Sequence, residues 1–195
     1  MITPYFKTYV NQLDQAFDTV DTSQLQKFAN VMVAAAENNR TIFVCGNGGS
    51  AAIADHLACD CLKGIRSVTH LKPKVVSLCS NGPLVSAIAN DYGYEYVFSY
   101  QLESLMQSGD ILITISSSGN SENIRKAIEF AKSKDYTVIS MCGFDGGASL
   151  DANIPIHVKA HNYGIVEDVH QAIMHLVSQY IRIENVKPGI RDLNL

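Results

Sequence analysis

From residue 41 onward, short apolar runs alternate with segments of helical periodicity, and this alternation limits the folds open to the chain. The apolar runs cover residues 41–46, 74–79, 110–116, 137–143 and 154–160. The helical segments cover residues 50–62, 83–90, 94–106, 122–134 and 166–184. Because strands that are apolar throughout must be covered on both faces, the pattern predicts a parallel sheet between two layers of helices. The expected class is α/β, a three-layer αβα sandwich with about five strands.

Two further helical segments, residues 5–20 and 24–37, precede the first strand. They predict a helical hairpin within residues 1–40, ahead of an αβα core over residues 41–184 and a tail over residues 185–195. With 195 residues, 47% of them hydrophobic, the chain is long enough for one well-filled core and short for two. We therefore expect a single domain.

Composition excludes several classes of protein. A net charge of −4 and a pI near 5.8 argue against a broad nucleic-acid-binding face. No apolar run approaches the roughly 20 residues of a membrane span, and the first residues lack the apolar block of a signal peptide, so we expect a cytoplasmic protein. The five cysteines are irregularly placed, which argues against a disulfide framework. Cys59 and Cys61 form only a weak zinc spacing.

The first apolar run is followed by a turn of small residues, Asn47, Gly48, Gly49 and Ser50. A strand that ends in this way and opens a helix points backbone N–H groups beyond the sheet edge, where an anion can bind. The alternative is a tight turn whose glycines supply unusual φ values and whose Ser50 caps the helix.

A second turn of this kind follows residues 110–116. It carries the hydroxyls of Ser116, Ser117, Ser118 and Ser121. Serine is also an ordinary turn and cap residue, but four serines in six positions after an apolar strand favour an anion site. Two such turns together indicate a phosphorylated small molecule as ligand.

Polar residues on two of the helical segments are candidate metal ligands. His56 and Asp60 are four apart and share one helix face, which suits a shared metal or a carboxylate that orients an imidazole. In the last helix, Glu167 is three residues from His170 and about 12 Å of helix rise from His175. The residues alone do not choose between the two histidines.

Two polar residues, Asn90 and Asp91, end the helical run that starts at residue 83. They are either turn residues or contacts to the hydroxyls of a sugar.

With these motifs, the chain resembles the sugar isomerase (SIS) domain family, and within it the phosphoheptose isomerases. The resemblance covers nearly the whole chain and rests chiefly on CGNGGS, the helix with His56, IANDYGYEYVF, ISSSGNSENIRKAI and the helix with His175. It implies a flavodoxin-like fold and conversion of D-sedoheptulose 7-phosphate to D-glycero-D-manno-heptose 7-phosphate, for lipopolysaccharide or capsule. It also implies a homotetramer, assembled partly through residues 1–40.

The resemblance assigns roles to individual residues. Substrate contacts fall on Asn47, Gly48, Gly49, Ser50, Asp60, Asn90, Asp91 and Glu167, and phosphate contacts on Ser116, Ser117, Ser118 and Ser121. The ligands of one Zn²⁺ per subunit fall on His56, Asp60, Glu167 and His175. Asp60 stands where the family usually has Glu, and Glu167 where it usually has Gln.

The resemblance also implies how the two catalytic groups act. Asp60 is expected as the base and His175 as the acid of an enediolate mechanism. Because binding zinc would reduce the basicity of Asp60, Glu167 is our reserve candidate for the base. The rival interpretation is a phosphosugar-binding regulator or assembly factor that has the same fold and performs no chemistry.

Overall fold

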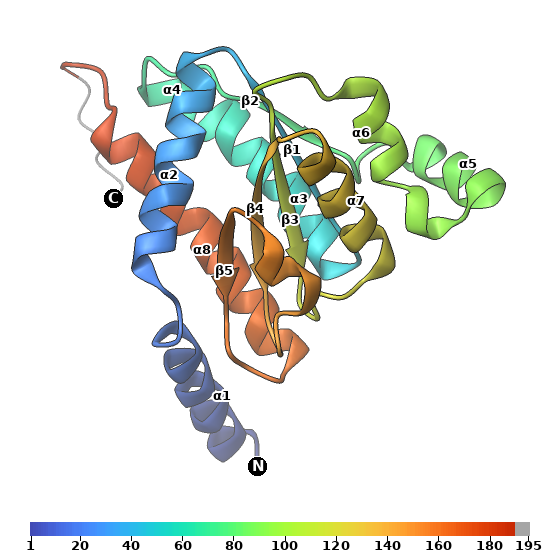
Figure 1. Cartoon of the computed structure of the whole chain (residues 1–195). Helices are drawn as coiled ribbons and strands as arrows, with labels where there is room; N and C mark the ends of the chain where they lie inside the picture. The colour runs from blue at the N-terminus through green and yellow to red at the C-terminus, as the bar shows by residue number, and fades with distance from the viewer. Residues whose placement is uncertain (190–195) are drawn as a thin grey trace.

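The computed structural model describes residues 1–189 and has a five-stranded, fully parallel sheet at its centre (Figure 1). The strands are β1 (Thr41–Gly46), β2 (Lys74–Ser77), β3 (Ile111–Ser116), β4 (Thr137–Cys142) and β5 (Ile154–His157). Their spatial order is β2-β1-β3-β4-β5, the order of flavodoxin-like folds. The predicted α/β class is therefore confirmed.

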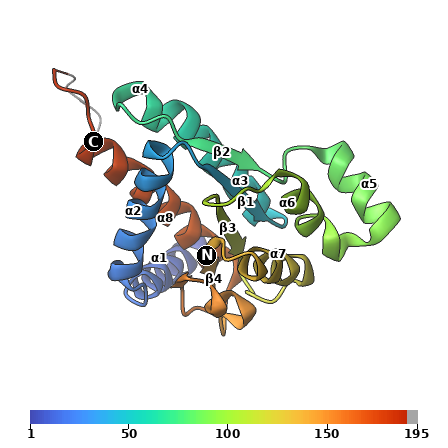
Figure 2. The same cartoon turned by 45° about the horizontal axis from the view of Figure 1, so that its top comes forward.

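Helices cover both faces of the sheet. The α-helices are α1 (Ile2–Phe17), α2 (Thr22–Glu37), α3 (Gly49–Cys59), α4 (Arg66–Val68), α5 (Gly82–Tyr92), α6 (Ser99–Leu105), α7 (Glu122–Ser133) and α8 (Tyr163–Glu184). The short elements are the π-helix η1 (Asp60–Ile65) and the 3₁₀ turns η2 (Tyr94–Tyr96) and η3 (Gly147–Asp151). Figure 2 shows α5, α6 and α7 on the opposite side of the sheet from α1, α2 and α8.

Each face of the sheet has its own apolar cluster. One contains Leu57 of α3, Ile113 of β3 and Val169 of α8, and the other contains Leu112 of β3 and Ile128 of α7. All six residues of β3 are buried, as expected for a central strand that is covered on both sides. The three-layer arrangement follows directly from this double coverage.

The N-terminal helices α1 and α2 both pack on α8. The Tyr9 hydroxyl of α1 donates a hydrogen bond to Asp168 Oδ2 at 2.6 Å, and this contact raises the pKa of Tyr9 to about 12. Figure 1 shows α1 extending past the sheet, and its apolar residues Tyr5, Phe6 and Val10 are exposed. These helices therefore have apolar surface beyond what α8 covers.

The helix expected over residues 50–62 changes its geometry at a candidate site residue. Regular α-helix ends at Cys59, and the π-helix η1 begins at Asp60. Single π-helical turns widen the backbone and occur often at functional sites. The segment over residues 94–106 is likewise divided, into η2 and α6.

The expected tail is partly tied to the fold. Val186 forms an antiparallel bridge with Thr69, and the Lys187 N–H donates to the carbonyl of Val68 at 2.9 Å. The rest of the tail, residues 190–195, lies outside the described residues. Within residues 1–189, no helix combines the length and the apolar character needed to cross a membrane.

Candidate active site between helices α3 and α8

The two small-residue turns lie side by side at the carboxyl ends of the strands. They follow β1 and β3, which are neighbours at the point where the strand order reverses, and ligands of open α/β sheets bind at such points. Asn47, after β1, and Asn123, at the start of α7, exchange two side-chain hydrogen bonds of 2.9 Å. The sequence did not single out Asn123, which is buried and joins the two turns.

A carboxylate from α8 lies beside the glycine turn at the start of α3. Gly48 has a φ of 53°, which favours glycine. A Cβ on Gly49 would lie 2.5 Å from Glu167 Oε2, so the carboxylate of α8 fills the space beside this glycine. A negative charge is favourable there because the N-terminus of a helix carries a partial positive charge.

The serine turn leaves hydroxyl groups free to bind a ligand. Ser116 Oγ and Ser118 Oγ accept hydrogen bonds from the backbone of Gly119 and Asn120, which leaves each O–H able to donate. Ser117 Oγ is buried and has no partner within residues 1–189. Ser121 occupies the N-cap position of α7, yet its side chain makes no capping hydrogen bond. These features favour the anion interpretation over simple capping.

Helices α3 and α8 bring three candidate metal ligands together. Asp60 Oδ1 lies 3.6 Å from His56 Nε2, and Asp60 Oδ2 lies 3.9 Å from His175 Nε2. One ligand atom from each of the three side chains falls within 4.8 Å of the other two. Imidazole nitrogen and carboxylate oxygen are ordinary zinc ligands, so the donor set fits the expected ion.

Two neighbours of this cluster were given no role on the basis of the sequence. Gln171 Nε2 lies 3.1 Å from His56 Nδ1 and 3.2 Å from His175 Nε2. Ser178 Oγ lies 3.4 Å from Asp60 Oδ2 and 3.0 Å from the carbonyl oxygen of His175, so its one O–H group is shared between these two acceptors. Gln171 is four residues before His175, and this helical spacing is the signal that could have found it.

The structure separates the two histidines of the last helix. His175 lies in the metal-ligand cluster, whereas His170 is fully buried in the core, where desolvation lowers its pKa to about 4. Glu167 lies beside Gly49 and is not among the three clustered groups. Neither Cys59 nor Cys61 belongs to the cluster, and burial raises the pKa of the Cys61 thiol well above its usual range.

The remaining sugar-contact candidates lie on α5, the helix that projects from the molecule (Figure 1). Asn90 Nδ2 donates to Asp91 Oδ1 at 2.8 Å, and both side chains are exposed. The nearby Tyr94 hydroxyl donates to Asn47 Oδ1 at 2.9 Å. Tyr94 thus connects this segment to the glycine turn, which the sequence did not predict.

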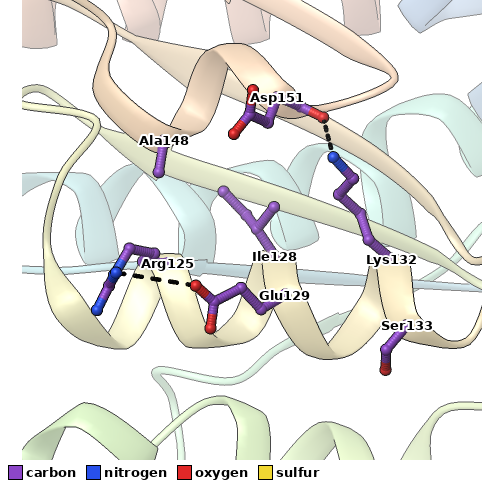
Figure 3. Close-up of a pocket in the computed structure, with 7 residues that line it drawn as sticks. All are labelled: Arg125, Ile128, Glu129, Lys132, Ser133, Ala148 and Asp151. Atoms are coloured by element: carbon purple, nitrogen blue, oxygen red, sulfur yellow. Dashed lines mark hydrogen bonds and ion pairs between the residues drawn. The ribbon is translucent and has the colours of Figure 1, made fainter.

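A hollow of about 600 Å³ between α7 and η3 has none of these residues in its lining (Figure 3). Its lining consists of Arg125, Ile128, Glu129, Lys132, Ser133, Ala148 and Asp151. Arg125 pairs with Glu122 and Glu129, and Lys132 Nζ donates to the carbonyl of Asp151 at 2.8 Å. Because both cations already have partners, the hollow is a poor candidate for an anion site.

Comparison with known proteins assigns the family. The SIS domain model matches residues 4–143. The phosphoheptose isomerase of Helicobacter hepaticus is 35% identical over 185 residues, which cover 94% of this chain and 93% of that protein. The chain belongs to the phosphoheptose isomerases. A solved phosphoheptose isomerase from Neisseria gonorrhoeae matches with a TM-score of 0.82 and 30% identity, over 92% of this chain and 96% of that one.

The SIS fold is shared more widely than this family. The sugar isomerase domain of an RpiR transcription factor from Sphaerobacter thermophilus matches with a TM-score of 0.65 and 15% identity, over 95% of this chain and 92% of that one. That likeness shows the fold alone. The fold alone does not distinguish a phosphoheptose isomerase from a regulator. The similarity to full-length phosphoheptose isomerases makes that distinction.

Proposed function

We propose that the chain interconverts D-sedoheptulose 7-phosphate and D-glycero-D-manno-heptose 7-phosphate, as a step in heptose supply for lipopolysaccharide or capsule. The observation that carries this proposal is the cluster of His56, Asp60 and His175. The cluster lies between α3 and α8, close to the glycine turn that opens α3, in a chain that belongs to this enzyme family. Direct measurement of product from sedoheptulose 7-phosphate tests it. Tight binding of the sugar phosphate without turnover would favour the regulator instead.

The spacing along α3 suits a long substrate. His56 lies seven residues after Gly49, which is about 10 Å of helix rise. A phosphate bound by Ser116, Ser117, Ser118 and Ser121 near the start of α3 would therefore lie far from the metal-ligand cluster. A sugar whose reacting carbons are several bonds from its phosphate fits this separation, with Asn47, Gly48, Gly49, Ser50, Asn90 and Asp91 as contacts to the rest of its chain.

The chemistry needs a proton moved between adjacent carbons. Asp60 takes the proton from the carbon next to the carbonyl and returns it to the adjacent carbon, while His175 moves a proton between the two substrate oxygens. The Ser178 hydroxyl lies beside the Asp60 carboxylate on one side. His56, Asp60 and His175 would hold one Zn²⁺, with Glu167 as the further ligand that the resemblance implies. When bound, the ion would polarise the carbonyl as a Lewis acid.

Removing a hydroxyl from the serine turn is expected to weaken phosphate binding. Ser118→Ala and Ser121→Ala each delete a hydrogen bond to a charged group, worth on the order of 1.5–3 kcal/mol, so KM should rise roughly ten-fold or more. Steady-state kinetics measures this. If both variants keep the parent KM, the turn serves only as a helix cap.

The enzyme is expected to be a homotetramer that uses residues 1–40. Tyr5, Phe6 and Val10 expose apolar surface on α1, and the His56, Asp60 and His175 side chains are 46, 28 and 39% exposed in the single chain. A neighbouring subunit would cover both regions. Light scattering at micromolar concentration checks the mass, and a fully active monomer would contradict this assignment.

A further inference from the structure

Tyr94 joins the segment after α5 to the glycine turn. Its hydroxyl donates a hydrogen bond of 2.9 Å to Asn47 Oδ1, which lies 47 positions earlier in the sequence. Gly93 directly before it has a φ of 105°, a conformation that favours glycine and turns the chain at this point. Tyr94 is 54% exposed, so its hydrogen bond does not serve to satisfy a polar group in the core.

Asn123 is the second partner of the same amide. Asn47 Nδ2 donates to Asn123 Oδ1, and Asn123 Nδ2 donates to Asn47 Oδ1, both at 2.9 Å. Asn47 Oδ1 therefore accepts two hydrogen bonds, and one of the two Nδ2 hydrogens is also used. If the Asn47 amide rotated by itself, donor would face donor and oxygen would face oxygen. The bonds thus hold the amide in place and leave it one N–H group to offer a ligand.

A further contact fixes the short turn η2, which carries Tyr94, on helix α7. Lys126 Nζ lies 4.5 Å from the centroid of the Tyr96 ring, which is a cation–π geometry. Lys126 is three residues after Asn123, about one helical turn along α7. The turn η2 is therefore tied to α7 through Tyr96 and to the glycine turn through Tyr94.

Asn47 is a position at which a fixed side chain aids binding. It is the first residue after β1, at the point of the sheet where ligands bind, and its carbonyl accepts the Ser50 N–H at 2.9 Å. The backbone of Asn47 is thus part of the turn that opens α3. Holding the side chain before the ligand arrives lowers the entropy cost of binding.

We propose that Tyr94 is a positioning residue that holds the Asn47 amide in place for the sugar phosphate, with Asn123 as its counterpart on α7. The effect of Tyr94 on the substrate passes through Asn47 and not through a contact of its own. Tyr94 thereby acts on the substrate site of the proposed function, on which this inference rests.

Tyr94→Phe removes the hydroxyl and keeps the ring. Loss of this hydrogen bond should raise the KM for D-sedoheptulose 7-phosphate about three- to ten-fold, with kcat within about two-fold of the parent. Because Tyr94 is exposed, Tm should stay within about three degrees of the parent value. Tyr96→Phe is the matched control, since it removes a hydroxyl from the same turn and keeps the ring beneath Lys126. Its KM should stay within about two-fold of the parent value.

Asn47→Ala separates a positioning role from a direct one. If Tyr94 acts only through Asn47, adding Tyr94→Phe to Asn47→Ala should change KM by less than about two-fold, because the acceptor of its hydrogen bond is already absent. A rise as large as in the parent would mean that Tyr94 acts independently of Asn47, which overturns the inference. Unchanged KM in Tyr94→Phe or in Asn47→Ala alone also overturns it.

Failure of this inference can be distinguished from failure of the proposed function. If the parent protein binds D-sedoheptulose 7-phosphate without converting it, the proposed reaction is wrong. The same comparison of variants then uses the Kd of this sugar phosphate, measured by calorimetry, and supports or overturns the role of Tyr94 on that basis. A parent protein that does not bind the sugar phosphate overturns both.

Discussion

Asp60→Asn and His175→Ala are each expected to lower kcat by about 10²–10⁴-fold, because a general acid or base contributes on that scale. Loss of the metal ion from either variant would add to the effect. Steady-state kinetics on purified protein measures the change, and circular dichroism checks that the fold remains. His70→Ala is the matched control, since His70 is exposed and lies outside the cluster.

Glu167→Gln identifies which carboxylate moves the proton. If Asp60 is the base, this variant should keep kcat within roughly an order of magnitude of the parent, because the amide preserves the shape of the side chain. A loss as large as that of Asp60→Asn would assign the proton transfer to Glu167. Unchanged turnover in both Asp60→Asn and His175→Ala would contradict the proposed mechanism.

Gly119→Ala is expected to cause the largest loss of stability, about 3 kcal/mol or more. Gly119 has a φ of 67°, and a Cβ there would overlap the backbone carbonyl of Gly146. For a chain of this size, such a loss lowers Tm by roughly 6–12 °C. Thermal unfolding measures it, and phosphate binding should weaken as well because Gly119 lies within the serine turn.

Gly64→Ala is the control for this substitution. Nothing lies within 4 Å of a Cβ placed on Gly64, and its φ is not in the left-handed region. Its Tm should therefore stay within a few degrees of the parent value. If Gly119→Ala is equally mild, the serine turn tolerates a backbone conformation other than the left-handed one at Gly119.

Much of the fold could be predicted from the sequence because it depends on local patterns. The apolar runs at residues 41–46 and 110–116 are flanked by helical periodicity, which requires parallel strands covered on both faces. The π-helical turn at Asp60 was not predicted, because the pattern of residues 50–62 is that of an ordinary helix.

The candidate site depends partly on local sequence patterns and partly on tertiary structure. Helical spacing placed His56 beside Asp60, and strand-to-helix turns placed anion-binding groups at the sheet edge. The sequence by itself thus determined the α/β class, the two turns and the residue types available for chemistry. Only tertiary structure decided that α3 and α8 face each other, because a contact between residues more than a hundred positions apart depends on how the helices pack on the sheet. That packing brought His175 and Gln171 to His56, and left His170 in the core.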